Sequence, residues 1–134
     1  MIGLGPSSIS QFRQGYAQNM PSTSEYRRMV DDGGLAAVRG IALSNDDRVR
    51  GWIIERLMCD FAFSAIDLVE RFGEAGQRLL LQSSSMALHD PVRLLELDGD
   101  RFVVPAESRP FVRSIAARFD KYFEAGTARH SAAV

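Results

Sequence analysis

Three short sequences of the form Ser-x-x-acid recur along the chain, each followed by apolar residues spaced as on one face of a helix. A serine and an acidic side chain three residues later are typical of a helix N-terminus, because they satisfy backbone N–H groups that lack partners there. The pairs are Ser22 with Glu25, Ser44 with Asp47, and Ser64 with Asp67. After the second pair, apolar residues at i, i+3, i+4 and i+8 predict a helix from about Asn45 to Cys59. These signals predict a mainly helical chain.

One β-hairpin is predicted between the helices. Residues 92–97 and 101–104 read as strands joined by Asp98-Gly99-Asp100, and Pro105 ends the pairing because proline has no N–H for the ladder. Helical spacing resumes between Phe111 and Phe123. The predicted fold class is therefore mainly α, a helical domain with one small β-hairpin. Its order of helix, helix, helix, hairpin, helix is winged-helix-like.

Winged-helix domains often bind DNA, but a fold does not determine a function. The candidate recognition segment, residues 74–86, carries Arg78 as its only basic residue, whereas a DNA reader needs several to neutralise phosphates. The whole chain of 134 residues has 16 basic and 17 acidic residues, a formal net charge of −1. We therefore expect no nucleic-acid partner.

The cysteine content excludes several classes of site. Cys59 is the only cysteine, so the chain can form neither a disulfide framework nor a self-contained iron–sulfur cluster or Cys-only zinc site. His89 and His130 are the only histidines, and we expect no metal site. We expect Cys59 on or near the buried side of its helix. The sequence also lacks a signal peptide and an apolar run of about 20 residues, so we expect a cytoplasmic location and no membrane partner.

The chain opens with a glycine turn, Gly3-Leu4-Gly5-Pro6-Ser7. Proline suits the first turn of a helix, so a helix is predicted to start here, and the free N–H groups of a helix N-terminus attract anions. A turn of this kind normally follows a strand, and no strand precedes it in this sequence. We therefore expect the chain to be the C-terminal piece of a longer protein.

Several motifs after this turn form a distinctive combination. They are Gly3-x-Gly5-x-Ser7-x-Ile9-Ser10, Tyr16-x-Gln18-Asn19, Tyr26, and Arg39-Gly40-x-x-Leu43-x-x-Asp46-Asp47-x-x-Arg50. Together they resemble the C-terminal part of bacterial oxygen-independent coproporphyrinogen III oxidase, over essentially the whole chain. The resemblance implies that residues 1–43 end a catalytic-domain region. It further implies that residues 44–125 form a helical, winged-helix-like domain covering the active site, and that residues 126–134 are a flexible tail.

The resemblance also implies an activity. Members of this radical S-adenosylmethionine family oxidatively decarboxylate two propionates of coproporphyrinogen III to vinyl groups, which gives protoporphyrinogen IX in haem biosynthesis. They use S-adenosylmethionine and a [4Fe-4S] cluster held by a CxxxCxxC loop. This chain has no such loop. The cluster and most of the cofactor site are therefore expected in a missing N-terminal part, and the chain alone is expected to be inactive, without catalytic residues or bound cofactor.

Two residues are candidates for binding. The resemblance implies that Ile9 contacts S-adenosylmethionine, although the residues alone equally allow Ile9 to be a core residue of its helix. Arg39 is a candidate contact to a propionate, because arginine binds carboxylates through charge-assisted, bidentate hydrogen bonds and because Arg39 lies in a predicted irregular connector. Alternatively, Arg39 is a structural arginine paired with Asp46 or Asp47.

The remaining polar and aromatic candidates have structural interpretations. Arg50 lies one turn after Asp46 and Asp47, which favours an ion pair within the helix. Hydrogen bonds from Tyr16 and Asn19 could order the glycine turn, or only stabilise a loop. Exposed positions are expected for His89 and His130, a core position for Trp52, and hairpin positions for Asp98 and Asp100.

Two alternative functions stay open. One is a haem-chaperone-type relative, which we expect to lack the Tyr16-x-Gln18-Asn19 segment and the string from Arg39 to Arg50. The other is an unrelated winged-helix interaction or DNA-binding module. If the chain is a fragment of a longer enzyme, the surface that faced the missing part would be exposed and apolar. We therefore expect the fragment to self-associate.

Overall fold

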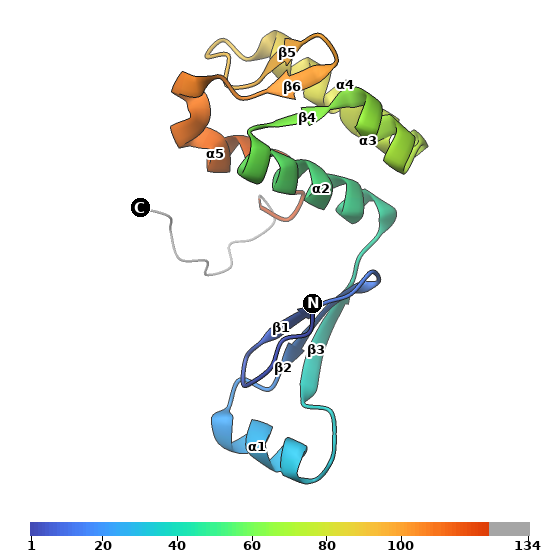
Figure 1. Ribbon diagram of the computed structural model, residues 1–134, viewed down its shortest axis with the longest axis vertical. Helices are drawn as coiled ribbons and strands as arrows, with labels where there is room; N and C mark the ends of the chain where they lie inside the picture. Colours follow the sequence, from blue (N-terminus) through green and yellow to red (C-terminus); the bar gives the residue numbers. More distant parts are fainter. Residues whose placement is uncertain (124–134) are drawn as a thin grey trace. The chain divides into compact units, whose positions relative to one another are not determined.

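The computed structural model describes residues 1–123. The chain divides into two compact units, unit 1 from Met1 to Ser44 and unit 2 from Asn45 onward (Figure 1). The tail expected at residues 126–134, and with it His130, lies outside the described residues. No helix among the described residues is long and apolar enough to cross a membrane.

Unit 1 is a three-stranded antiparallel sheet with one helix. The strands are β1 (Ile9–Gln11), β2 (Gly15–Asn19) and β3 (Ala37–Ala42), in the order β1-β2-β3, and α1 (Thr23–Asp31) connects β2 to β3 (Figure 1). Pairing leaves the small residues Ser10, Ala17 and Gly40 opposite one another, so that the larger side chains project from the other face.

Two expectations about unit 1 are wrong. No helix starts at Pro6; Ile9 instead opens strand β1 and is 53% exposed, so it is not a core residue of a helix. The segment from Ala37 to Ala42 is a strand rather than an irregular connector. The strands β1 and β3 both pair with β2. For β3 this partner is distant in sequence, so local sequence patterns do not reveal the pairing.

Two of the three helix-start signals are confirmed by their hydrogen bonds. The hydroxyl of Ser22 accepts from the Glu25 N–H at 3.5 Å, at the start of α1. The hydroxyl of Ser64 accepts from the Asp67 N–H at 3.2 Å, at the start of the helix α3 (Ala65–Phe72). The helix predicted after Ser44 is also present, as α2 (Asn45–Asp60).

Unit 2 packs helices around a second three-stranded sheet. Its elements are α2 (Asn45–Asp60), β4 (Ala62–Ser64), α3 (Ala65–Phe72), α4 (Glu74–His89), β5 (Glu96–Asp98), β6 (Arg101–Val103), the 3-10 helix η1 (Ala106–Phe111) and α5 (Val112–Ala117). The strand order is β4-β6-β5, with antiparallel pairing throughout. The predicted hairpin is present as β5–β6, but its first strand begins at Glu96 rather than at residue 92. The strand β4 was not predicted.

These elements confirm a mainly helical fold with small antiparallel sheets. The winged-helix comparison itself stays an interpretation. The last predicted helix is shorter than expected: it ends at Ala117, and η1 precedes it, with Pro110 inside η1. Proline cannot donate to a helical ladder, which fits a short 3-10 segment at this point.

The hydrophobic core cluster of residues 1–123 lies within unit 2. Its buried members are Val49, Ile53, Leu57, Phe63, Leu68, Ala75, Leu79, Leu95, Phe102, Val104, Ile115 and Phe119. The rings of Phe63 and Phe102, on paired strands, stack with their centroids 5.0 Å apart. Trp52 packs against this core, as predicted.

Cys59 is exposed, which contradicts the expectation that it lies near the buried side of its helix. The buried residues of α2 are Val49, Ile53 and Leu57, which recur every four residues. Cys59 comes two residues after the last of these. At about 100° per residue, it is rotated by roughly 200° from Leu57, toward the opposite face.

Candidate functional site

The glycine turn that precedes β1 is folded tightly and held by its neighbours. Gly5 has a φ angle of 99° and Ser7 has one of 58°. Residues other than glycine rarely adopt such positive φ angles. The N–H of Ser7 donates to the Met20 carbonyl at 3.1 Å, and the Ser8 hydroxyl donates to the Leu4 carbonyl at 2.6 Å. The turn therefore has a defined conformation, although it does not begin a helix.

Two side chains from outside the turn bind its peptide groups. The amide nitrogen Nδ2 of Asn19 donates to the carbonyl oxygens of Gly3, at 3.2 Å, and of Gly5, at 3.1 Å. The hydroxyl of Tyr26 accepts from the Gly5 N–H at 3.1 Å. The predicted ordering of the turn by hydrogen bonds thus holds for Asn19. The Tyr16 hydroxyl contacts Gln11 Nε2 instead, at 3.4 Å.

The sheet of unit 1 brings the two predicted binding residues into one row. Ile9 in β1 is directly opposite Gln18 in β2, and Gln18 is directly opposite Arg39 in β3. Directly opposite residues on neighbouring strands project from the same face. Thus Ile9 and Arg39, which are 30 positions apart in sequence, lie on one face with Gln18 between them.

A shallow hollow of about 240 Å³ lies over this row. Its lining residues are Ile9, Tyr16, Ala17, Gln18, Arg39, Gly40 and Ile41. Ile9 and Ile41 are each 53% exposed and Tyr16 is 38% exposed, so the hollow combines apolar side chains with one guanidinium. This composition suits a ligand that has an apolar part and a carboxylate.

Unit 2 has a larger hollow, of about 640 Å³, with a different character. It is lined by Trp52, Glu55, Arg56, Asp67, Glu70 and Arg71. Glu55 and Asp60 each contact the Arg56 guanidinium at 2.8 Å, and the Glu55 hydrogen bond is the main cause of the raised pKa of Arg56. Opposite charges already pair within this hollow, and it contains none of the residues that the sequence assigned to binding.

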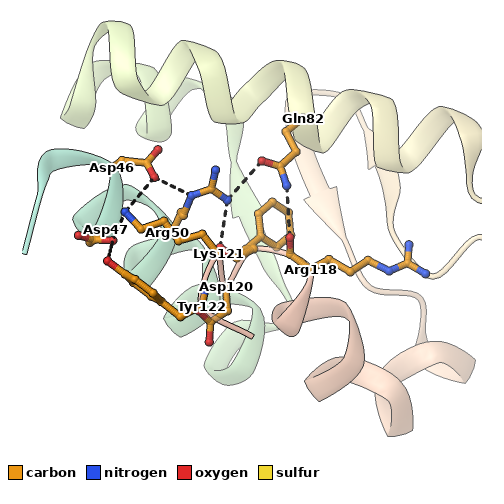
Figure 2. Close-up of polar contacts among 9 residues, drawn as sticks. Asp46, Asp47, Arg50, Gln82, Arg118, Asp120, Lys121 and Tyr122 are labelled. Atoms are coloured by element: carbon orange, nitrogen blue, oxygen red, sulfur yellow. Dashed lines mark hydrogen bonds and ion pairs between the residues drawn. The ribbon is translucent and has the colours of Figure 1, made fainter. Parts of the chain in front are cut away.

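A polar network in unit 2 centres on Arg50 (Figure 2). Arg50 Nε contacts Asp46 Oδ2 at 2.8 Å, which confirms the ion pair predicted within the helix. The same guanidinium donates to the Phe119 carbonyl at 3.1 Å and to Gln82 Oε1 at 3.4 Å. Its side chain is 20% exposed, so these contacts are partly shielded from water.

The segment after α5 is attached to the start of α2 through the same network (Figure 2). Lys121 Nζ contacts Asp47 Oδ1 at 2.6 Å, and the Tyr122 hydroxyl donates to the same oxygen at 3.2 Å. The hydrogen bond with Asp47 is the main cause of the raised pKa of Lys121. No local sequence signal links Lys121 to a residue 74 positions earlier, so this contact was not predicted.

The described residues do not provide an iron–sulfur site. Among residues 1–123, no group of three or more His, Cys, Asp or Glu side chains is placed so that it could hold a metal ion. Cys59 is an exposed thiol on α2. A cluster of four cysteine thiolates does not fit this chain alone.

Three polar residues considered in the sequence analysis, His89, Asp98 and Asp100, line neither hollow. His89 is exposed, as expected, although it is the last residue of α4 rather than part of a loop. Asp98 and Asp100 are exposed at the β5–β6 hairpin. The hydroxyl of Ser64 donates to the Asp100 carboxylate at 3.1 Å, which gives Asp100 a structural contact.

Comparison with known proteins gives a consistent set of relatives. The chain matches no protein-family model. It is 40% identical, over 94% of its length, to oxygen-independent coproporphyrinogen III oxidase of Cereibacter sphaeroides, and 37% identical, over its whole length, to the enzyme of that name from Bradyrhizobium diazoefficiens. The chain spans 28% and 30% of the length of these relatives.

A solved structure matches this chain in fold. It is coproporphyrinogen III oxidase from Escherichia coli, described as a radical SAM enzyme, and it superposes with a TM-score of 0.77 at 30% identity. The match covers 90% of this chain and 28% of that one. In sequence and in fold, this chain is therefore related to the C-terminal part of oxygen-independent coproporphyrinogen III oxidase.

Proposed function

We propose that the chain acts as part of an oxygen-independent coproporphyrinogen III oxidase, an oxidoreductase of porphyrin biosynthesis. The observation that carries this proposal is that one hollow is lined by both Ile9 and Arg39, the two residues assigned to binding on sequence grounds. The relatives of the same name, 37% and 40% identical to this chain, support the same activity.

Ile9 and Arg39 have distinct roles in this proposal. Ile9 offers an apolar contact to S-adenosylmethionine, and Arg39 offers charge-assisted hydrogen bonds to a propionate of coproporphyrinogen III. When bound, S-adenosylmethionine and an iron–sulfur cluster supply the radical chemistry of such enzymes. Because Cys59 is the chain's only cysteine, the cluster ligands must come from another part of the enzyme.

The proposal has consequences for the 134-residue chain alone. It is inactive, and after iron–sulfur reconstitution it shows no cluster absorbance. The cytoplasm is its proposed location, since a free, exposed thiol suits a reducing compartment. Exposed apolar residues of unit 1, such as Ile9 and Ile41, favour self-association, and a strict monomer in concentrated sedimentation samples would contradict this.

A chimera tests the function. In it, this chain replaces the matching 28% of the Escherichia coli enzyme. We expect the chimera to decarboxylate coproporphyrinogen III, and Arg39→Ala to raise KM for that substrate about 10-fold or more, as for the loss of a hydrogen bond to a charged group. Arg13→Ala, an exposed arginine of the same unit that does not line the hollow, is the control.

The outcomes of this test are distinct. An inactive chimera with a normal iron content contradicts the enzyme function and favours the haem-chaperone-type alternative or an interaction module. An active chimera in which Arg39→Ala leaves KM unchanged contradicts only the role of Arg39. Strong, salt-sensitive DNA binding by the chain would instead favour the DNA-binding alternative, although α4 carries Arg78 as its only arginine or lysine.

A further inference from the structure

We propose that Asn19 and Tyr26 are positioning residues that clamp the glycine turn and thereby set the affinity of the neighbouring hollow for S-adenosylmethionine. This inference rests on the proposed function of the hollow. Neither residue lines the hollow, so any effect on cofactor binding has to pass through the turn.

The two side chains hold the same residue from two directions. Asn19 Nδ2 binds the carbonyl oxygen of Gly5 at 3.1 Å, and Tyr26 Oη binds its N–H at 3.1 Å. Asn19 also holds the Gly3 carbonyl at 3.2 Å. Both peptide groups that flank the Gly5 α-carbon are therefore fixed by side chains from other elements.

Each clamping residue is placed by a distinct local feature. The pairing of β2 with β3 shifts register between Gln18 and Asn19, an irregularity of the kind that re-aims a side chain. Tyr26 lies in the first turn of α1, where its N–H donates to the Ser22 carbonyl at 2.8 Å. Asn19 thus reaches the glycine turn from strand β2, and Tyr26 reaches it from helix α1.

The turn has backbone conformations that depend on such support. Gly5 and Ser7 have φ angles of 99° and 58°, and a non-glycine residue in this region persists only where its surroundings hold it. The turn leads through Ser8 directly into Ile9, at the edge of the hollow. Loss of the clamp is therefore expected to let Ile9 sample other positions.

Two conservative variants test the clamp in the active chimera. Tyr26→Phe removes only the hydroxyl that accepts from Gly5. Asn19→Asp keeps the shape of the side chain but replaces the donating amide with an acceptor that faces two carbonyl oxygens. We expect each to raise KM for S-adenosylmethionine about 3- to 10-fold, the effect of one lost hydrogen bond, with kcat changed less than about 2-fold.

Matched controls separate this effect from a general loss of stability. Tyr122→Phe removes a hydroxyl that bonds Asp47 in unit 2, and Asn45→Asp changes an exposed asparagine at the start of α2. Both controls are expected to keep KM for S-adenosylmethionine unchanged. In the isolated chain, the Gly5 amide proton is expected to exchange with solvent about 3- to 10-fold faster in Tyr26→Phe than in the unsubstituted chain.

The result has three clear forms. If the chimera is active, and Tyr26→Phe and Asn19→Asp each raise KM for S-adenosylmethionine with kcat nearly unchanged, the clamp is supported. An active chimera whose variants keep KM, or lower kcat with KM unchanged, contradicts the clamp but not the proposed function. An inactive unsubstituted chimera contradicts the proposed function and the clamp with it.

Discussion

Unit 1 and unit 2 are stabilised in opposite ways. Within residues 45–123, the described part of unit 2, twelve residues are buried in one hydrophobic cluster. Within residues 1–44, all of which the structure describes, only Ser10, Gly15 and Ala36 are buried. No residue of α1 is buried, and every residue of β3 is exposed. Unit 1 therefore depends on hydrogen bonds of its sheet and turn, and unit 2 on apolar burial.

The difference indicates where binding can occur. Residues that build a core are already surrounded, whereas an exposed sheet face with apolar side chains and an arginine has contacts still to make. The candidate site lies on such a face, at Ile9 and Arg39. The unit with little internal stabilisation is thus the one that contains the proposed binding residues.

Separation of the units should give the largest effect. A peptide of residues 1–44 is expected to show no cooperative thermal unfolding, because so short a segment without a buried apolar core does not offset its loss of conformational entropy. Residues 45–134 are expected to unfold cooperatively, as followed by circular dichroism. Cooperative unfolding of the 1–44 peptide would contradict the comparison.

Removal of a large apolar side chain should affect the two units unequally. Phe102→Ala, in the core of unit 2, is expected to lower the free energy of unfolding by about 3–5 kcal/mol through the cavity that it leaves. Ile41→Ala, at a half-exposed position of β3, should change it by less than about 0.5 kcal/mol. Urea denaturation measures both, and similar losses at the two positions would contradict the contrast.

Arg50 tests how far polar contacts contribute to unit 2. Arg50→Ala is expected to cost about 1.5–3 kcal/mol, because it removes the charged donor to the Phe119 carbonyl and leaves the Asp46 carboxylate with only the longer contact to Lys121, at 3.7 Å. Arg50→Lys should recover only part of this, since an ammonium lacks the planar fork of the guanidinium. Arg48→Ala, at an exposed position of the same helix, is the control, and full recovery by lysine would contradict the role of the fork.

The smallest expected effect is the alkaline dependence due to Lys121. Asp47 raises the pKa of Lys121 in the folded chain, so this pair stabilises the fold below the ordinary pKa of lysine. The contribution is lost as pH rises through the raised pKa. Lys121→Met should therefore flatten the alkaline fall in the urea midpoint, and an identical fall in both proteins would contradict the assignment.

Local signals in the sequence predicted the helices of this chain well. The starts of α1 and α3 were predicted from serine caps, and the Arg50–Asp46 pair from a spacing of four residues. Such features depend on residues within one helical turn, so they are visible without the rest of the fold. The β5–β6 hairpin was predicted for the same reason, from its Asp-Gly turn.

Features that depend on distant residues were not predicted. The strand β3 was expected as a connector, because it depends on pairing with β2, from which α1 separates it. The strand β1 pairs with β2 locally, but it was expected as a helix because Pro6 suggested a helix start and residues 12–14 carry no Asp-Gly signal. Tyr26 was noted only as part of a motif, and its contact with Gly5 spans 21 residues. Cys59 is a different case, because the apolar spacing of α2 by itself already places it roughly 200° from Leu57, on the exposed side.

The sequence by itself determined the helical character of unit 2, the absence of a self-contained cluster site, and the motifs that relate the chain to coproporphyrinogen III oxidases. Only the tertiary structure decided that Ile9, Gln18 and Arg39 lie in one row across the sheet. The same is true of the hydrogen bonds that join Asn19 and Tyr26 to Gly5. The physical reason is range: helix caps and ion pairs act within one turn of chain, whereas strand pairing unites residues whose separation in sequence carries no signal.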